Sequence, residues 1–108
     1  MIRVGEHLVR GAVVDAQTRC AHYRTSLDVV AMRFHCCGEW YPCVHCHDEA
    51  AGHPRTVWPA AQAGAVAALC GVCAHGMSVA EYRVATECPG CGAAFNPRCA
   101  LHQSLYFE

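Results

Sequence analysis

Residues 36–53 read CCGEWYPCVHCHDEAAGH and are crowded with cysteine and histidine. They contain a Cys-Cys doublet and a Cys-x2-Cys pair, the spacing that lets one tight turn present two thiolates to the same ion. Further pairs lie on both sides of this stretch: Cys20-x-His22, Cys70-x2-Cys73, Cys88-x2-Cys91 and Cys99-x2-His102. A single pair would also suit a redox dithiol, but the whole series with its matched histidines indicates a zinc protein.

The 108 residues have the size of one small domain, and their composition limits its core. The hydrophobic fraction is 54%, yet ten of these residues are cysteine and eighteen are alanine. Small domains of this kind are stabilised by metal ions or disulfides. We therefore predict a small zinc-stapled α+β fold, with short strands, zinc knuckles and one or two short helices around metal sites rather than a large core.

Ten cysteines could also form five disulfides, as in a secreted scaffold. Residues 1–7 show no apolar export segment, and the most apolar run, residues 60–69, is too short to cross a membrane. We therefore expect a cytoplasmic protein, where thiols stay reduced and clustered cysteine and histidine act as metal ligands.

The charge pattern argues against a nucleic-acid partner. The formal net charge is −1, and nine thiolates on three Zn2+ ions would lower it to about −4. A nucleic-acid-binding surface needs a basic stripe, whereas the eight arginines are scattered singly and lysine is absent. We expect no nucleic-acid or membrane partner, and a monomer.

The local pattern predicts short elements between the ligand pairs. Apolar and β-branched residues predict strands, and residues 43–51, directly after Pro42, predict a short helix. Ser78 with Glu81 three residues later forms a capping-box signature. The expected elements are strands at 7–14, 27–34 and 65–69, a helix at 43–51, a connector at 52–64, and a strand–turn or short helix at 77–85. Gly38 permits the tight turn after Cys36 and Cys37.

The C-terminal half predicts one closed zinc site. Its two knuckles, spaced Cys-x2-Cys-x14-Cys-x2-Cys, supply Cys70, Cys73, Cys88 and Cys91. Four filled positions leave no open position for a substrate, so the site is expected to be structural. The alternative is two independent redox dithiols.

The N-terminal half supplies eight ligands, enough for two tetrahedral ions. Cys46 and His47 are neighbours on the expected helix, so they face different ways and serve different ions. We assign one ion to Cys20, His22, Cys43 and Cys46, and the other to Cys36, Cys37, His47 and His53. The two sites then interleave in sequence.

The motif Cys20-Ala21-His22-Tyr23 resembles the one that names the CHY-type zinc finger family, and the later ligands follow in that family's order. The resemblance covers residues 11–108 and is greatest to short stand-alone members, which include a yeast mitochondrial helper of small Tim proteins. It implies three zinc ions in one module spanning residues 1–108, with two interleaved sites in 11–55 and a zinc-ribbon-like four-cysteine part and tail in 65–108. Other members carry a RING domain in ubiquitin ligases, but no second RING-type series follows here.

Several residues near the ligands have other expected roles. Cys99 and His102 alone cannot complete a zinc site, which needs four ligands. Either they pack beside one of the zinc sites, or they replace a ligand assigned above, or Cys99 is a free thiol. Asp48 is expected to orient a ligating histidine. The remaining histidines are not expected to be ligands: His7, His35, His45 and His75. The aromatic residues expected to pack over the sites are Tyr23, Trp40, Tyr41, Trp58, Phe95 and Phe107.

The sequence shows no Ser/His/Asp arrangement, phosphate loop or His-Glu zinc motif, so we do not expect an enzyme. The leading hypothesis is a structural zinc module that binds another protein. The runner-up, which the resemblance implies, is a zinc or thiol-redox homeostasis factor that helps cysteine-rich partners. A thiol oxidoreductase would require a metal-free pair with a lowered pKa.

Overall fold

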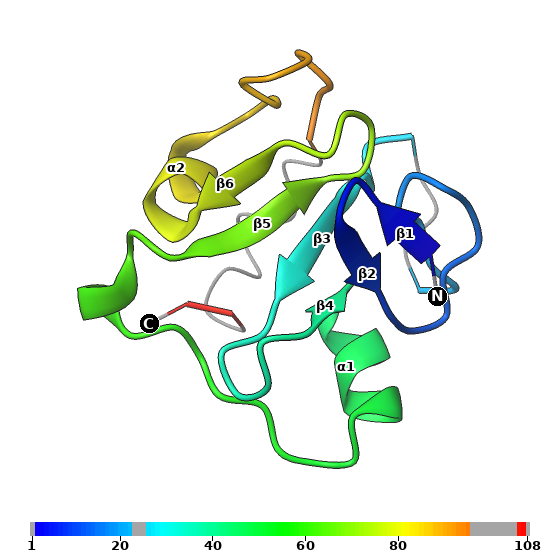
Figure 1. The fold of residues 1–108 in the computed structure, drawn as a ribbon, viewed down its shortest axis with the longest axis vertical. Helices are drawn as coiled ribbons and strands as arrows, with labels where there is room; N and C mark the ends of the chain where they lie inside the picture. Colours follow the sequence, from blue (N-terminus) through cyan, green and yellow to red (C-terminus); the bar gives the residue numbers. More distant parts are fainter. Residues whose placement is uncertain (1, 23–25, 96–105, 108) are drawn as a thin grey trace.

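The computed structural model describes residues 2–22, 26–95 and 106–107. Six short strands form one sheet in the order β1-β2-β4-β3-β5-β6 (Figure 1). The strands are β1 (Ile2–Val4), β2 (His7–Val9), β3 (Val30–Arg33), β4 (Trp40–Tyr41), β5 (Val66–Cys70) and β6 (Gly76–Ser78). All neighbours pair antiparallel except β2 and β4, which are joined in parallel through Val9 and Trp40.

Two short α-helices and one 3-10 turn accompany the sheet in the described ranges: α1 (Val44–Ala50), α2 (Val79–Val84) and η1 (Ala60–Gln62). Helix α1 lies next to β4, and α2 lies next to β5 and β6 (Figure 1). The predicted small α+β fold is therefore confirmed. Neither α-helix in these ranges has the length and hydrophobicity that a bilayer-spanning segment needs.

The boundaries of several elements differ from those expected. The strand expected at 7–14 ends at Val9, and its hairpin partner β1 was not predicted. The strand expected at 27–34 is shortened to Val30–Arg33. Helix α1 was predicted correctly, and the segment at 77–85 forms the end of β6 followed by α2.

Local signals explain where the helices begin. The Ser78 hydroxyl accepts a bond from the Glu81 backbone N–H at 3.2 Å, while the Glu81 carboxylate accepts one from the Ser78 N–H at 3.1 Å. This is the predicted capping box. At α1 the sulfur of Cys43 takes the capping position and accepts from the Cys46 N–H. The turn at Gly38 has a φ of 69°, as the sequence predicted.

The core lies on both faces of the sheet. Ala31 and Leu69 pack on one face with Val9 and Trp40. Their strand neighbours point to the opposite face and join a larger cluster that contains Phe34, Met77 and most of the cysteines. The aromatic residues expected to pack over the metal sites are buried, with at most 8% of each exposed, but only four of them join the cluster that contains cysteines: Tyr41, Trp58, Phe95 and Phe107. For Trp40 the expectation was wrong, since it packs in the other cluster. Trp40 contacts His7 on the first face, whereas Tyr23 lies outside the described residues.

The segment Tyr106–Phe107 packs into the larger cluster. The Trp58 backbone N–H donates to the Tyr106 carbonyl at 2.8 Å, and the Tyr106 hydroxyl accepts from the Val44 N–H at 3.0 Å. That second bond satisfies one of the backbone donors left free at the start of α1. The tail thus contacts the helix that carries ligands for two of the sites described next.

Candidate metal centre

Three groups of four cysteine and histidine side chains converge, and within each group the donor atoms all lie within 4.8 Å of one another. We call them the three-cysteine site (Cys20, His22, Cys43, Cys46), the two-histidine site (Cys36, Cys37, His47, His53) and the four-cysteine site (Cys70, Cys73, Cys88, Cys91). This is the grouping assigned from the sequence. Cys99 and His102, the two additional candidates, lie outside the described residues.

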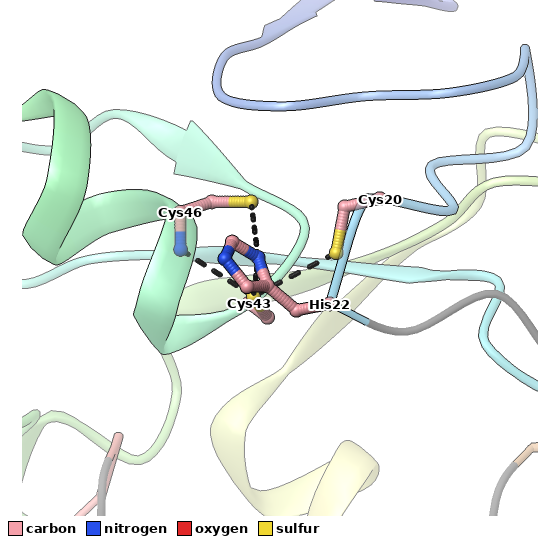
Figure 2. A group of neighbouring side chains, drawn as sticks. All are labelled: Cys20, His22, Cys43 and Cys46. Carbon is pink, nitrogen blue, oxygen red and sulfur yellow. Dashed lines mark hydrogen bonds between the residues drawn. The ribbon is translucent and has the colours of Figure 1, made fainter.

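The three-cysteine site joins the loop after β2 to the start of α1 (Figure 2). A bridge between Val13 and Cys20 brings Cys20 to the site, and its Sγ lies 3.7 Å from that of Cys43. The Nδ1 atom of His22 lies 3.5 Å from the Sγ atoms of both Cys43 and Cys46. Nδ1 is therefore the nitrogen that faces the sulfurs.

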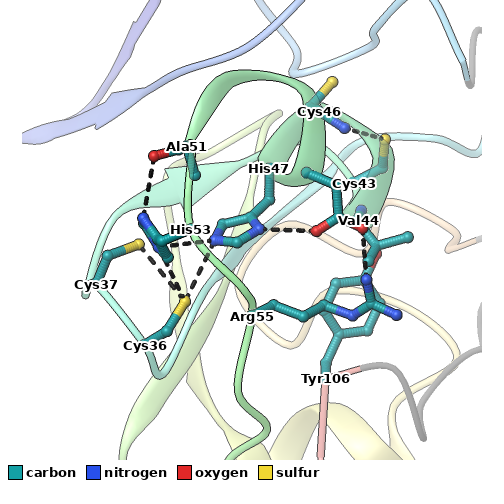
Figure 3. A network of polar contacts seen from close by, with 11 residues as sticks. Cys36, Cys37, Cys43, Val44, Cys46, His47, Ala51, His53, Arg55 and Tyr106 are labelled. Carbon is teal, nitrogen blue, oxygen red and sulfur yellow. Dashed lines mark hydrogen bonds and ion pairs between the residues drawn. The ribbon is translucent and has the colours of Figure 1, made fainter.

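The two-histidine site lies on the other side of α1 (Figure 3). The Sγ of Cys36 lies 3.9 Å from that of Cys37, 3.2 Å from His47 Nε2 and 3.4 Å from His53 Nε2. The two Nε2 atoms are 3.3 Å apart. Both histidines thus turn Nε2 toward the sulfurs, whereas His22 uses Nδ1.

The outer nitrogen of each histidine is held by an acceptor. His22 Nε2 donates to the Glu49 carboxylate at 2.9 Å. His47 is fully buried, and its Nδ1 donates to Asp48 at 3.0 Å. His53 Nδ1 donates to the Ala51 carbonyl at 3.0 Å. Such partners fix the tautomer and ring orientation of metal-binding histidines. Asp48 was expected from the sequence in this role, whereas Glu49 was not.

Helix α1 supplies both N-terminal sites. Successive helical residues are rotated by about 100°, so Cys46 faces the three-cysteine site while His47 faces the two-histidine site. Asp48 reaches His47 as its neighbour along the chain, whereas Glu49, three residues after Cys46, lies on the helix face of the three-cysteine site and reaches His22. A helix of seven residues thus organises two donor sets and their supporting carboxylates.

The four-cysteine site is built from two tight turns. The first follows β5 and is closed by a bond from the Ala74 N–H to the Cys70 carbonyl; the second is closed from Gly92 to Cys88. The Sγ of Cys70 lies 3.8 Å from that of Cys91, and the Sγ of Cys73 lies 3.6 Å from that of Cys88. Cys70 and Cys88 are buried, whereas Cys73 and Cys91 are exposed.

The donor geometry fits zinc at all three sites. Tetrahedral Zn2+ has Zn–S bonds of about 2.3 Å and Zn–N bonds of about 2.0–2.1 Å, which places neighbouring donors about 3.8 Å (S–S), 3.6 Å (S–N) and 3.3 Å (N–N) apart. The observed contacts are 3.6–3.9, 3.2–3.5 and 3.3 Å, respectively. A disulfide needs about 2.05 Å, and none of the nine cysteines within the described residues forms one.

Crowding of the thiols makes a cation necessary if they are to ionise together. Hydrogen bonds with Cys20 and Cys46, together with burial, raise the pKa of Cys43. Burial raises the pKa of Cys70 to about 12. Burial acts in the same direction on Cys88, but bonds from nearby backbone N–H groups and thiols lower its pKa to about 7. Zinc supplies the positive charge that these thiolates need.

Within the described residues, four other histidines lie outside the three sites. His35 Nδ1 bonds the Thr56 hydroxyl at 2.7 Å, and the ring of His7 lies against Trp40. The ring of His45 is 5.4 Å from that of His22. A Cβ atom at position 90 would lie 3.1 Å from His75, which places that side chain beside the second knuckle of the four-cysteine site.

Comparison with known proteins agrees with this donor pattern. The model of the CHY zinc finger family matches residues 20–103. Helper of Tim protein 13 from Saccharomyces cerevisiae is 41% identical over 107 residues, covering 95% of this chain and 92% of the relative. Helper of Tim protein 13 from Kluyveromyces lactis is 39% identical over 99 residues, covering 92% and 87%.

A third relative, an uncharacterized protein from Schizosaccharomyces pombe, is 42% identical over 100 residues, covering 93% of this chain and 88% of the relative. No solved structure matches the chain. The donor geometry and these matches define a small zinc-binding protein. The chain belongs to the CHY zinc finger family and, as its sequence indicated, resembles the short stand-alone members.

Proposed function

We propose that this chain is a structural zinc module that holds three zinc ions and presents a surface to a protein partner. The observation that carries the proposal is the completeness of the donor sets, since each site supplies the four ligands of structural zinc. With all four positions filled by protein, the sites support the fold rather than catalysis, so the protein is proposed not to be an enzyme. The absence of disulfides among the nine described cysteines favours a cytoplasmic location.

A protein partner is supported by the relatives. Two of them carry the name Helper of Tim protein 13, which describes an action on another protein. We propose that this chain also acts on a protein, and that it works as a monomer without binding nucleic acid or membranes. Its scattered arginines and slightly negative net charge favour a protein over a nucleic acid.

Native mass spectrometry of freshly purified protein, compared with its denatured metal-free mass, tests the zinc proposal. We expect three zinc ions and no disulfide. Fewer ions, together with disulfides among the knuckles, would refute the structural interpretation. Cross-linking of the zinc-loaded and metal-free chains to a defined client then tests partner binding. We expect cross-links from the loaded chain alone, and equal cross-linking by both forms would contradict the proposal.

A second candidate, zinc or thiol homeostasis on behalf of cysteine-rich partners, is favoured by one observation. The four-cysteine site exposes Cys73 and Cys91 to solvent, whereas every sulfur of the three-cysteine site is buried. A competing thiol or chelator therefore has easier access to the four-cysteine site than to the three-cysteine site. Graded chelation separates the two functions: loss of one ion from a folded chain supports zinc handling, whereas loss of all ions with unfolding supports a purely structural role.

A further inference from the structure

The loop that brings Cys20 to the three-cysteine site packs on the first knuckle of the four-cysteine site. Gly71, which follows Cys70, is the point of contact. A Cβ atom at Gly71 would lie 2.3 Å from the Gln17 carbonyl oxygen, closer than real Cβ atoms approach other atoms, and 3.0 Å from Thr18 Cγ2. Its φ lies outside the left-handed region, so this contact by itself requires glycine.

The contacting loop is closed at its base. The Asp15 carboxylate accepts bonds from the N–H groups of Gln17 and Arg19 at 2.8 and 3.2 Å. The Val14 N–H donates to the Arg19 carbonyl at 2.8 Å. These bonds make residues 14–19 a compact turn. A displacement of Gln17 and Thr18 at its tip would therefore also move Cys20, which follows the turn directly.

Thr18, at the tip of this loop, is held in an unfavourable conformation. Its φ is 70°, which is strained for a β-branched residue. The side chain is 2% exposed, and its hydroxyl has no hydrogen-bond partner in the part of the chain that the structure describes. The hydroxyl contributes no bond that could offset this strain, so the conformation depends on packing of the buried side chain, which includes its contact with Gly71.

The same N-terminal segment makes two further close contacts. A Cβ atom at Gly5 would lie 2.8 Å from the Cβ of Ala74, in the first knuckle of the four-cysteine site. A Cβ atom at Gly11 would lie 2.7 Å from the Cβ of Cys46 and 3.1 Å from its Sγ, in the three-cysteine site. Residues 5–18 therefore contact both sites.

We propose that the four-cysteine and three-cysteine sites bind metal cooperatively, coupled through the contact of Gln17 and Thr18 with Gly71. When the four-cysteine site holds an ion, the turn after Cys70 is fixed and the loop of residues 14–19 packs against it. Cys20 is then held close to the other ligands of the three-cysteine site, so less conformational entropy is lost when the three-cysteine site binds its ion. Coupling of this kind changes affinity about 5- to 150-fold, and it acts equally in both directions.

Cadmium NMR can observe each site separately, because the three donor sets differ in their numbers of sulfur and nitrogen atoms and each gives its own resonance. The inference rests on the proposed occupancy of these sites. If resonances of the three donor types do not appear, the proposed function fails as well. If they appear and fill independently, only the coupling is wrong.

The first experiment titrates the metal-free, reduced chain with cadmium. Resonance intensities give the occupancy of each site, and native mass spectrometry of the same samples counts the ions on each chain. We expect more chains with both the four-cysteine and the three-cysteine site filled than the product of the two occupancies, and a fraction equal to that product would overturn the proposal. This measurement needs no variant, so it remains decisive if a substitution prevents folding.

The second experiment compares Gly71→Ala with Gly64→Ala, where a Cβ atom would meet nothing within 4 Å. Gly71→Ala is expected to weaken cadmium binding at the three-cysteine site about 5- to 150-fold, and Gly64→Ala to leave it unchanged. Cys91→Ser removes a ligand of the four-cysteine site on the knuckle opposite the loop, so it is expected to weaken the three-cysteine site as well. Unchanged affinity of the three-cysteine site in Gly71→Ala and Cys91→Ser would overturn the coupling.

Discussion

Replacement of Asp48 by alanine tests whether α1 supports two metal sites from adjacent residues. Asp48 accepts a hydrogen bond from His47 Nδ1 and also pairs with Arg55. Because His47 is fully buried, loss of the carboxylate leaves an N–H group without a partner and a ring without its orienting contact. We expect the two-histidine site to lose metal affinity while the three-cysteine site keeps it.

The magnitude follows from the burial of the two histidines. Loss of such a supporting carboxylate lowers metal affinity about 10- to 100-fold, or about 1.4–2.7 kcal/mol. The upper end of this range is expected for Asp48→Ala, since the His47 side chain is 0% exposed. Glu49→Ala removes the equivalent contact from His22, where the side chains are 24% and 64% exposed. Water can replace that carboxylate, so the lower end is expected there.

The assay is competition for zinc with a chromophoric chelator, with cadmium NMR to identify the site that loses its ion. Glu49→Ala is the matched control, because it lies next to Asp48 on the same helix but contacts the other site. Asp48→Asn keeps an acceptor oxygen and should recover part of the affinity. Equal weakening of both sites by Asp48→Ala, or no weakening, would refute the reasoning.

Three further predictions concern stability and pH. Ser78→Ala removes the cap of α2 and is expected to lower the free energy of unfolding by about 1 kcal/mol in urea titrations at fixed zinc; an unchanged midpoint would show that the cap is dispensable. Phe107→Ala leaves a cavity in the core, because the Phe107 side chain is only 2% exposed, so the free energy of unfolding is expected to fall by about 3–5 kcal/mol in the same assay. A decrease below about 1 kcal/mol would mean that Phe107 is not part of the core. Zinc affinity of the four-cysteine site is expected to fall as pH is lowered, because zinc must displace the proton of Cys70, whose pKa is about 12. The affinity should fall more steeply below about pH 7, where Cys88 is protonated as well. Calorimetry in buffers of different ionisation enthalpy measures the protons released when zinc binds, and zero release would contradict this prediction.

Part of the grouping of the donors could be predicted because it depends on local geometry. Cys46 and His47 are adjacent on a helix, which places these two residues in different sites, whereas the assignment of the other six N-terminal ligands did not follow from local geometry. The capping box at Ser78 and the helix after Cys43 follow from local sequence in the same way. The separation of Cys46 from His47, the capping box and the helix each needed only residues a few positions apart.

The order of the sheet depends on pairings that local sequence does not encode. Trp40 and Tyr41 form a two-residue strand only because β3 and β2 lie on either side of them. The bond between Tyr106 and Val44 joins residues 62 positions apart. Glu49 could have been suggested by its place three residues after Cys46, but its partner His22 comes from a distant loop.

The interleaved ligands also have a consequence for biosynthesis. Cys20 and His22 leave the ribosome before the residues that complete either N-terminal site, and His53 follows the last ligand of the three-cysteine site. Gly71, on which the Cys20 loop packs, is synthesised later than all of these. A nascent chain therefore cannot complete the four-cysteine site until residue 91 has emerged, and during that interval the thiols of Cys70, Cys73 and Cys88 are open to oxidation.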